Sequence, residues 1–232
     1  MSQNSKLPAS SSKLILALDV DSFKKAKYFV NKLSPQIKIF KVGSQLFTAV
    51  GPEIIEFIHK KRAYVFLDLK FFDIPNTVAN AVRQAVRLKV NMLTLHIAGG
   101  QEMLKQAVKA AKEESRLLKL KPPLLIGVTI LTSQEADCDD VLRLAKLGLN
   151  CGLDGVVCSV REAQLLRKAI KRRFVLVTPG IRPKKVGIDD QKRTATAAEA
   201  LRAGSDFLVI GRPILEAREP LKAAEAIIKE LS

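Results

Sequence analysis

The sequence predicts an α/β fold, a single (β/α)8 TIM barrel, and two observations carry that prediction. From Lys13 onward, short apolar runs alternate with longer amphipathic stretches, and the order never breaks. Eight such units in about 220 residues match a barrel of eight parallel strands, whose typical size is about 250 residues. We therefore expect one catalytic barrel over residues 13–232, preceded by a flexible Ser-rich tail over residues 1–12.

The first four strands are expected where apolar runs end on a polar or charged residue or lead into one. They are Leu14–Leu18, Ile37–Val42, Tyr64–Leu69 and Met92–His96. Parallel strands that are buried on both faces have nearly continuous apolar sequences, as these do. After the third strand, a helix is indicated because Ala79, Val82, Val86 and Leu88 share one helical face.

The last four strands follow the same pattern. They are expected at Leu124–Leu131, Gly155–Cys158, Phe174–Val177 and Phe207–Ile210. Helical spacing returns after the sixth strand, at Ala163, Leu166, Ala169 and Ile170. A doubly wound open sheet is the competing architecture, but its Gly-rich first turn, G-x-G-x-x-G, is missing after Leu18.

The charge balance favours an anionic partner. The chain has 39 Lys and Arg against 23 Asp and Glu, a formal net charge of +16. Binders of single-stranded nucleic acid use aromatic stacking platforms, whereas aromatic residues make up 5% of this chain and Trp is absent. We interpret the basic stretches at 116–121 and 167–173 as solvated helix faces and expect a small phosphorylated substrate and no nucleic acid. A basic nucleic-acid-binding barrel without activity is the alternative.

Other classes of protein are disfavoured by composition. With 47% apolar and 27% charged residues the chain does not resemble a disordered protein, and no apolar run approaches the roughly 18 residues of a membrane span. Cys138, Cys151 and Cys158 lack C-x-x-C spacing, which predicts neither a disulfide framework nor a zinc site. We expect a cytoplasmic protein that does not bind membranes.

Functional residues of such a barrel lie at the carboxyl ends of its strands, and here those ends are unusually charged. The candidates at these ends are Asp19, Lys41, Asp68, Lys70, Asp73, His96, Thr132, Ser133, Arg182 and Arg212. Asp19 or Lys41 taken singly also fits a helix cap or a rim charge. Their occurrence on successive strands favours a site.

The third strand is the most informative. Asp68 and Lys70 are two residues apart, so both side chains should point into the mouth of the barrel. Opposite charges at close range favour each other's charged form, and Asp73 is placed to hold the same ammonium from its other side. A lysine kept cationic in this way is a poor Schiff-base nucleophile and a good proton donor. A structural ion pair that plugs the barrel is the alternative.

The end of the chain predicts a phosphate site. Gly211-Arg212-Pro213 follows the eighth strand, where barrels commonly hold phosphate, and would present helix N–H groups and a guanidinium. The basic loop from Arg182 to Lys192 would form the other wall and close as a lid, with Arg182 and Gln191 contributing side chains. A surface loop with scattered charges is the alternative.

The sequence lacks the motifs of a metal site. Its two histidines, His59 in a helical stretch and His96 at a strand end, show neither H-x-H nor H-E-x-x-H spacing. We interpret His59 as an exposed helix residue and His96 as a histidine of the core or behind the site. We expect a reaction without a metal or organic cofactor.

The segment Asp68-Leu69-Lys70-Phe71-Phe72-Asp73-Ile74-Pro75-Asn76-Thr77 resembles the D-x-K-x-x-D motif of the orotidine 5′-phosphate decarboxylase family. The resemblance covers Leu14 to Leu231. It includes L-A-L-D ending at Asp19, K-V-G starting at Lys41, L-T-S around Thr132, P-G-I-R ending at Arg182, D-Q-K-R around Gln191 and I-G-R-P around Arg212.

The resemblance implies a carboxy-lyase that converts orotidine 5′-monophosphate to uridine 5′-monophosphate, the last step of de novo pyrimidine synthesis, without a cofactor. It implies Lys70 as the acid that protonates C6, and Asp68 beside the departing carboxylate. The implied substrate contacts are Asp19 and Lys41 at the ribose, Thr132 at the pyrimidine, and Arg182, Gln191, Gly211 and Arg212 at the phosphate.

The same resemblance implies a homodimer in which Asp73, Ile74 and Thr77 reach the neighbouring subunit's site. Related barrels use a similar motif in a magnesium-dependent sugar-phosphate decarboxylase, the nearest enzyme alternative. The sequence has no added carboxylate near Lys41 to hold that ion.

Overall fold

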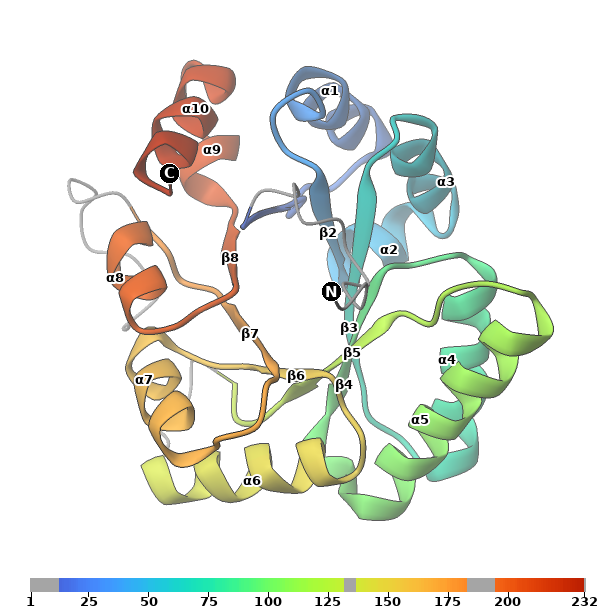
Figure 1. Ribbon diagram of the computed structural model, residues 1–232. Helices are drawn as coiled ribbons and strands as arrows, with labels where there is room; N and C mark the ends of the chain where they lie inside the picture. The colour runs from blue at the N-terminus through green and yellow to red at the C-terminus, as the bar shows by residue number, and fades with distance from the viewer. Residues whose placement is uncertain (1–12, 132–136, 183–194, 232) are drawn as a thin grey trace.

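In the computed structural model, which describes residues 13–131, 137–182 and 195–231, eight parallel strands close into a barrel surrounded by helices (Figure 1). The strands pair in chain order, and β8 returns to pair with β1. They are β1 (Leu14–Ala17), β2 (Ile39–Gly43), β3 (Tyr64–Phe71), β4 (Met92–His96), β5 (Leu124–Val128), β6 (Gly155–Val157), β7 (Val175–Thr178) and β8 (Phe207–Ile210). The predicted (β/α)8 barrel is confirmed; the predicted tail over residues 1–12 lies outside the described residues.

Helices follow the strands and cover the outside of the barrel (Figure 1). They are α1 (Phe23–Leu33), α2 (Ser44–Val50), α3 (Glu53–Lys60), α4 (Pro75–Arg87), α5 (Gly100–Leu117), α6 (Cys138–Asn150), α7 (Val160–Ala169), α8 (Ala197–Arg202), α9 (Arg212–Leu215) and α10 (Pro220–Glu230), with a 3-10 turn at Ile97–Gly99. The predicted helical face on α4 is buried at Ala79, Val82 and Val86. Within the described ranges, none of these helices is both long enough and apolar enough to cross a membrane.

The fifth strand is shorter than predicted. It ends at Val128 rather than Leu131, because its neighbours offer no backbone partner beyond that point. The last pairs on its two sides are His96 with Val128 and Val128 with Val157. Residues 129–131 therefore leave the sheet at the mouth of the barrel.

Two apolar clusters hold the barrel together, and strand alternation separates them. Every second side chain points inward, and the inner cluster contains Ile15, Ala17, Ile39, Phe66, Met92, Leu124, Ile126, Val177 and Val209. The intervening residues, such as Leu67 and Leu93, join the larger outer cluster beneath the helices. Polar residues at inward positions above this inner core therefore face the mouth of the barrel.

The opposite, amino-terminal end of the barrel carries a repeated hydrogen bond that sequence reasoning missed. In three cases, an Asn or Asp lies directly before an even-numbered strand. Its side-chain oxygen accepts a hydrogen bond from the backbone N–H of the second residue in the preceding strand. The pairs are Asn91 with Val65 at 2.8 Å, Asp154 with Leu125 at 2.9 Å and Asp206 with Leu176 at 2.7 Å. These bonds satisfy buried backbone donors far from the charged end.

Candidate active site

A cavity of about 220 Å³ opens at the carboxyl ends of the strands, where the inward-facing positions continue above the inner core. Its lining residues are Ala17, Asp19, Lys41, Phe66, Asp68, Lys70, Val128, Ile130, Leu131, Val157, Val177, Pro179, Gly180, Arg182, Val209, Gly211 and Arg212. Charged groups from β2, from β3 and from Asp19 just after β1 form one side, and apolar side chains from β5, β6 and β7 form much of the other. The sequence predicted the charged members and missed the apolar wall.

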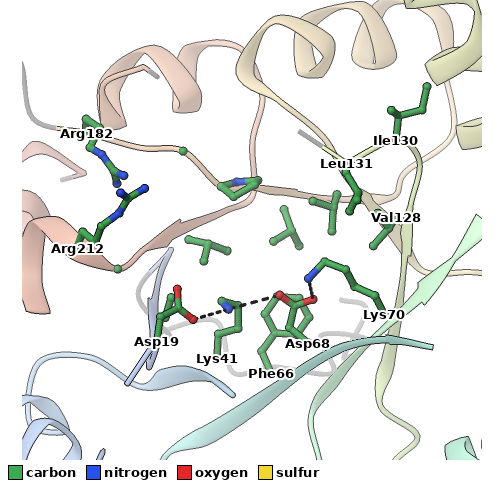
Figure 2. A pocket seen from close by; sticks show the side chains of 17 residues that line it. Asp19, Lys41, Phe66, Asp68, Lys70, Val128, Ile130, Leu131, Arg182 and Arg212 are labelled. Atoms are coloured by element: carbon green, nitrogen blue, oxygen red, sulfur yellow. Dashed lines mark hydrogen bonds and ion pairs between the residues drawn. The ribbon is translucent and has the colours of Figure 1, made fainter. Parts of the chain in front are cut away.

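Four charged side chains form a continuous chain across the floor of this cavity (Figure 2). Lys41 Nζ lies 3.0 Å from Asp19 Oδ1 and 3.4 Å from Asp68 Oδ2, and Lys70 Nζ lies 3.0 Å from Asp68 Oδ1. Charges therefore alternate in sign, and Asp68 accepts from an ammonium on each side. Asp68 and Lys70 do point into the barrel mouth, as their spacing predicts.

The ionisation of Lys41 and Asp68 follows from this pairing. Burial alone would lower the pKa of Lys41, but the negative charges of Asp68 and Asp19 outweigh it and raise the pKa above its ordinary value. Burial alone would raise the pKa of Asp68, yet the charges of Lys41 and Lys70, with hydrogen bonds from Lys70 and Thr94, lower it. Both groups are therefore charged at neutral pH.

Lys41 crosses the floor close to the backbone of its own strand. A Cβ added at Gly43 would lie 3.1 Å from Lys41 Nζ, tighter than most real contacts. Glycine at this position therefore leaves the ammonium the space between the two carboxylates.

The backbone of β3 departs from regular sheet geometry at Lys70. The pairing register with β4 shifts between Leu67 and Phe71, and Lys70 has a left-handed φ of 49°. Its N–H donates to Thr94 Oγ1 at 2.8 Å, and that hydroxyl donates to Asp68 Oδ1 at 3.0 Å. Sequence reasoning missed Thr94, although it lies two residues before His96 and thus on the same face of its strand.

Two guanidinium groups lie on the side of the cavity away from Lys70. Figure 2 shows the Arg182 and Arg212 side chains approaching each other there. The Arg182 N–H donates to the Ala195 carbonyl oxygen at 2.9 Å, which ties this residue to the chain entering α8. Two guanidinium groups that line the same side of a cavity favour an anionic ligand there. The predicted helix at Arg212 begins there but runs only to Leu215.

The segment after β3 turns out of the cavity. Asp73 is exposed and accepts from the Ile74 N–H at 2.6 Å, and among the described side chains it forms no ion pair with Lys70. The prediction that Asp73 holds the Lys70 ammonium of its own chain is therefore wrong for the described residues. Ile74 and Thr77 are exposed as well, and Phe72 and Ile74 are 62% and 67% exposed.

The two histidines differ in their surroundings. His96 is half-buried beside the Phe72 ring, and burial together with the positive charge of Lys70 lowers its pKa. His59 is not the exposed residue that the sequence predicts. It is half-buried, with Nδ1 3.3 Å from the Ala63 carbonyl oxygen, because the chain turns back beneath it to enter β3.

Several candidates have no described geometry. Thr132, Ser133 and Gln191 lie outside the described residues, as does most of the loop predicted to act as a lid. Ile130 and Leu131, which lead to Thr132, line the cavity. In the described portion of the chain, no group of three or more His, Cys, Asp and Glu side chains is arranged to hold a metal ion.

Known proteins resemble this chain over nearly its whole length. A family model described as "Orotidine 5′-phosphate decarboxylase / HUMPS family" matches residues 12–227. Orotidine 5′-phosphate decarboxylases from Coxiella burnetii and Trichlorobacter lovleyi are 49% and 46% identical over 230 residues, covering 94% of this chain and 96% and 95% of theirs.

A solved structure also matches the fold. The crystal structure of orotidine 5′-phosphate decarboxylase from Lactobacillus acidophilus superposes with a TM-score of 0.83 at 34% identity, covering 96% of this chain and all of that one. With the barrel, the alternating charges on its floor and these full-length similarities, the chain belongs to the orotidine 5′-phosphate decarboxylase / HUMPS family.

Proposed function

We propose that the protein decarboxylates orotidine 5′-monophosphate to uridine 5′-monophosphate and carbon dioxide, the last step of de novo pyrimidine biosynthesis. The observation that carries the proposal is the Lys70 ammonium, held 3.0 Å from Asp68 at one side of a cavity whose other side presents Arg182 and Arg212. The decarboxylase names of relatives that match the whole chain support the same reaction.

The chemistry assigned to Lys70 needs no metal or organic cofactor. When the bond from C6 to the carboxylate breaks, the electron pair stays on C6 and carbon dioxide leaves. Lys70 then donates a proton to C6 and regains one from solvent. A fixed ammonium also stabilises negative charge as it develops, and such preorganised electrostatics usually make the largest contribution to catalysis. Asp68 holds this ammonium in place and lies beside the departing carboxylate.

The remaining residues would bind the nucleotide along the cavity. Asp19 and Lys41, joined at 3.0 Å, contact the ribose hydroxyls and complete the charge network. Arg182, Gly211 and Arg212, together with Gln191, hold the phosphate, and Thr132 contacts the pyrimidine edge. Binding energy from the distant phosphate then helps to hold the pyrimidine against Lys70.

We further propose a homodimer with shared sites. Asp73, Ile74 and Thr77 are exposed at the start of α4 and do not line their own chain's cavity. Large exposed apolar groups such as Phe72 and Ile74 are typical of a surface that is covered by a partner. A second subunit would bring Asp73 to the Lys70 ammonium of its neighbour, with Ile74 and Thr77 against the substrate.

The proposed location is the cytoplasm. Cys138, Cys151 and Cys158 are all free thiols. Disulfides are rare in the reducing cytosol, so three free thiols are compatible with that compartment.

Replacing Lys70 tests the proposed acid directly. Lys70→Ala should retain the fold and the affinity for uridine 5′-monophosphate while losing nearly all turnover, because phosphate binding lies elsewhere in the cavity. Binding is measured by isothermal titration and turnover by absorbance. Substantial residual turnover would contradict the role of Lys70 as proton donor.

Mixing two inactive variants tests the shared site. Lys70→Ala and Asp73→Asn subunits, unfolded together and refolded, should recover about a quarter of wild-type activity, because half of randomly paired dimers are hybrids with one intact site. Each variant refolded alone is the control. Mixed samples no more active than these controls would mean that each subunit supplies its own Asp73.

A further inference from the structure

The hydroxyl of Thr94 closes a ring of hydrogen bonds around the proposed acid. The Lys70 N–H donates to Thr94 Oγ1 at 2.8 Å, and Thr94 Oγ1 donates to Asp68 Oδ1 at 3.0 Å. The same oxygen, Asp68 Oδ1, accepts from Lys70 Nζ at 3.0 Å. Lys70 is thus held at its backbone and at its ammonium through one carboxylate and one hydroxyl.

The geometry leaves this hydroxyl little freedom. Thr94 is fully buried on β4, on the inward face between Met92 and His96. Because its oxygen accepts the Lys70 N–H, its single proton is directed to Asp68. A hydroxyl donates one hydrogen bond and accepts another at the same time. An apolar side chain of the same shape would leave the Lys70 N–H without its acceptor and Asp68 Oδ1 without one of its donors.

The Lys70 backbone needs such a restraint. Its φ of 49° is uncommon for a residue other than glycine and costs conformational energy. This conformation lies within the register shift between Leu67 and Phe71, where regular sheet pairing is interrupted. The bond to Thr94 Oγ1 therefore takes the place of a sheet hydrogen bond at Lys70.

We propose that Thr94 is a positioning residue, which fixes the Asp68 carboxylate and the Lys70 backbone so that the ammonium is aimed at the reacting carbon. Its catalytic consequence rests on the decarboxylation proposed above. Its effect on Asp68 does not, because that hydrogen bond exists without substrate.

Three variants separate positioning from packing. Thr94→Val removes the hydroxyl and keeps the shape, whereas Thr94→Ser keeps the hydroxyl. Thr178→Val is the matched control, because Thr178 is also fully buried in a strand and hydrogen-bonded, to Ser205 Oγ at 2.7 Å, but its neighbour Val177 is the residue that faces the cavity. Thermal unfolding of each variant confirms that it folds.

The kinetic result should appear in kcat. Thr94→Val should lower kcat about 10- to 100-fold, the range of one hydrogen bond to a charged group, with KM and the affinity for uridine 5′-monophosphate nearly unchanged. Thr94→Ser should stay within a few fold of wild type, and Thr178→Val should match it. A loss of kcat as large in Thr94→Ser as in Thr94→Val would overturn the inference.

A titration without substrate tests the same bond. In protein labelled with ¹³C-aspartate, Thr94→Val should shift the Asp68 titration to higher pH, because a donor that favours the carboxylate is lost. Thr94→Ser and Thr178→Val should titrate like wild type. If wild type does not decarboxylate the nucleotide, the proposed function fails and this titration still decides the role of Thr94; an unshifted Asp68 in Thr94→Val refutes it.

Discussion

Replacing Asp68 by Asn should destabilise the barrel in a way that depends on pH. The Asp68 side chain is 12% exposed, and its carboxylate lies between two ammonium groups, 3.4 Å from Lys41 Nζ and 3.0 Å from Lys70 Nζ. Asn has nearly the same shape but no charge. The substitution therefore leaves both cations without the carboxylate they share.

The size of the loss follows from the remaining partners. Removing one partner of a buried ion pair costs about 3–5 kcal/mol. Lys41 keeps Asp19 at 3.0 Å, and the Lys70 side chain is 38% exposed, so water compensates part of its charge. We therefore expect a loss of stability at the lower end of this range, about 3 kcal/mol at pH 7. Such a loss lowers Tm by about 6–12 °C in a chain of this size.

The pH dependence has a definite sign. Because the pKa of Asp68 is lowered on folding, its contribution is fully present above the unfolded value of about 3.9 and is lost as pH falls through the folded value. Asn imitates the protonated carboxyl. The difference between the free energies of unfolding of wild type and Asp68→Asn should therefore begin to shrink as pH falls below about 4 and should vanish below the folded pKa of Asp68.

Urea unfolding between pH 3 and pH 7 measures this difference. Asp21→Asn is the control, since it removes the same charge from an exposed surface ion pair with Lys25 and should leave the free energy of unfolding nearly unchanged. A gap between wild type and Asp68→Asn that is absent at pH 7, or that stays constant down to pH 3, would refute the reasoning.

Three other predictions concern the two ends of the barrel and its thiols. Arg212→Ala should weaken binding of uridine 5′-monophosphate about 10- to 100-fold and leave uridine unaffected; calorimetry showing equal losses for both would exclude a phosphate contact. Asp206→Ala removes the shared acceptor of the Leu176 N–H and of the Arg167 guanidinium and should cost about 1–3 kcal/mol in urea unfolding with kcat unchanged; an unchanged free energy of unfolding would contradict this prediction. Burial raises the pKa of Cys158 to about 12, so at pH 8 a disulfide reagent should modify exposed Cys138 quickly and Cys158 only after denaturation. Fast labelling of Cys158 in the folded protein would contradict this prediction.

The sequence predicts the barrel well because the pattern that indicates each strand lies within that strand. Each strand is a continuous apolar run, and burial on both faces is what a parallel strand requires. The inward direction of Asp68 also follows from alternation within one strand. The position at which β5 ends cannot be predicted in this way, because it depends on how far β4 and β6 extend beside it.

The site contains two features that residue spacing could not provide. The sequence predicts Asp73 beside the Lys70 ammonium. The left-handed backbone at Lys70 and the register shift around it redirect the chain, so that Asp73 is exposed instead. Thr94 was missed because a threonine within an apolar strand is an ordinary strand residue. Its role depends on a contact between strands, with Asp68 twenty-six positions away.

The most direct test of the proposed function is the ultraviolet absorbance of orotidine 5′-monophosphate mixed with the purified protein and excess EDTA. We predict a steady change toward the spectrum of uridine 5′-monophosphate, at the same rate when magnesium replaces EDTA. A change that requires magnesium would contradict the cofactor-free reaction, and no change under either condition would contradict decarboxylation of this nucleotide.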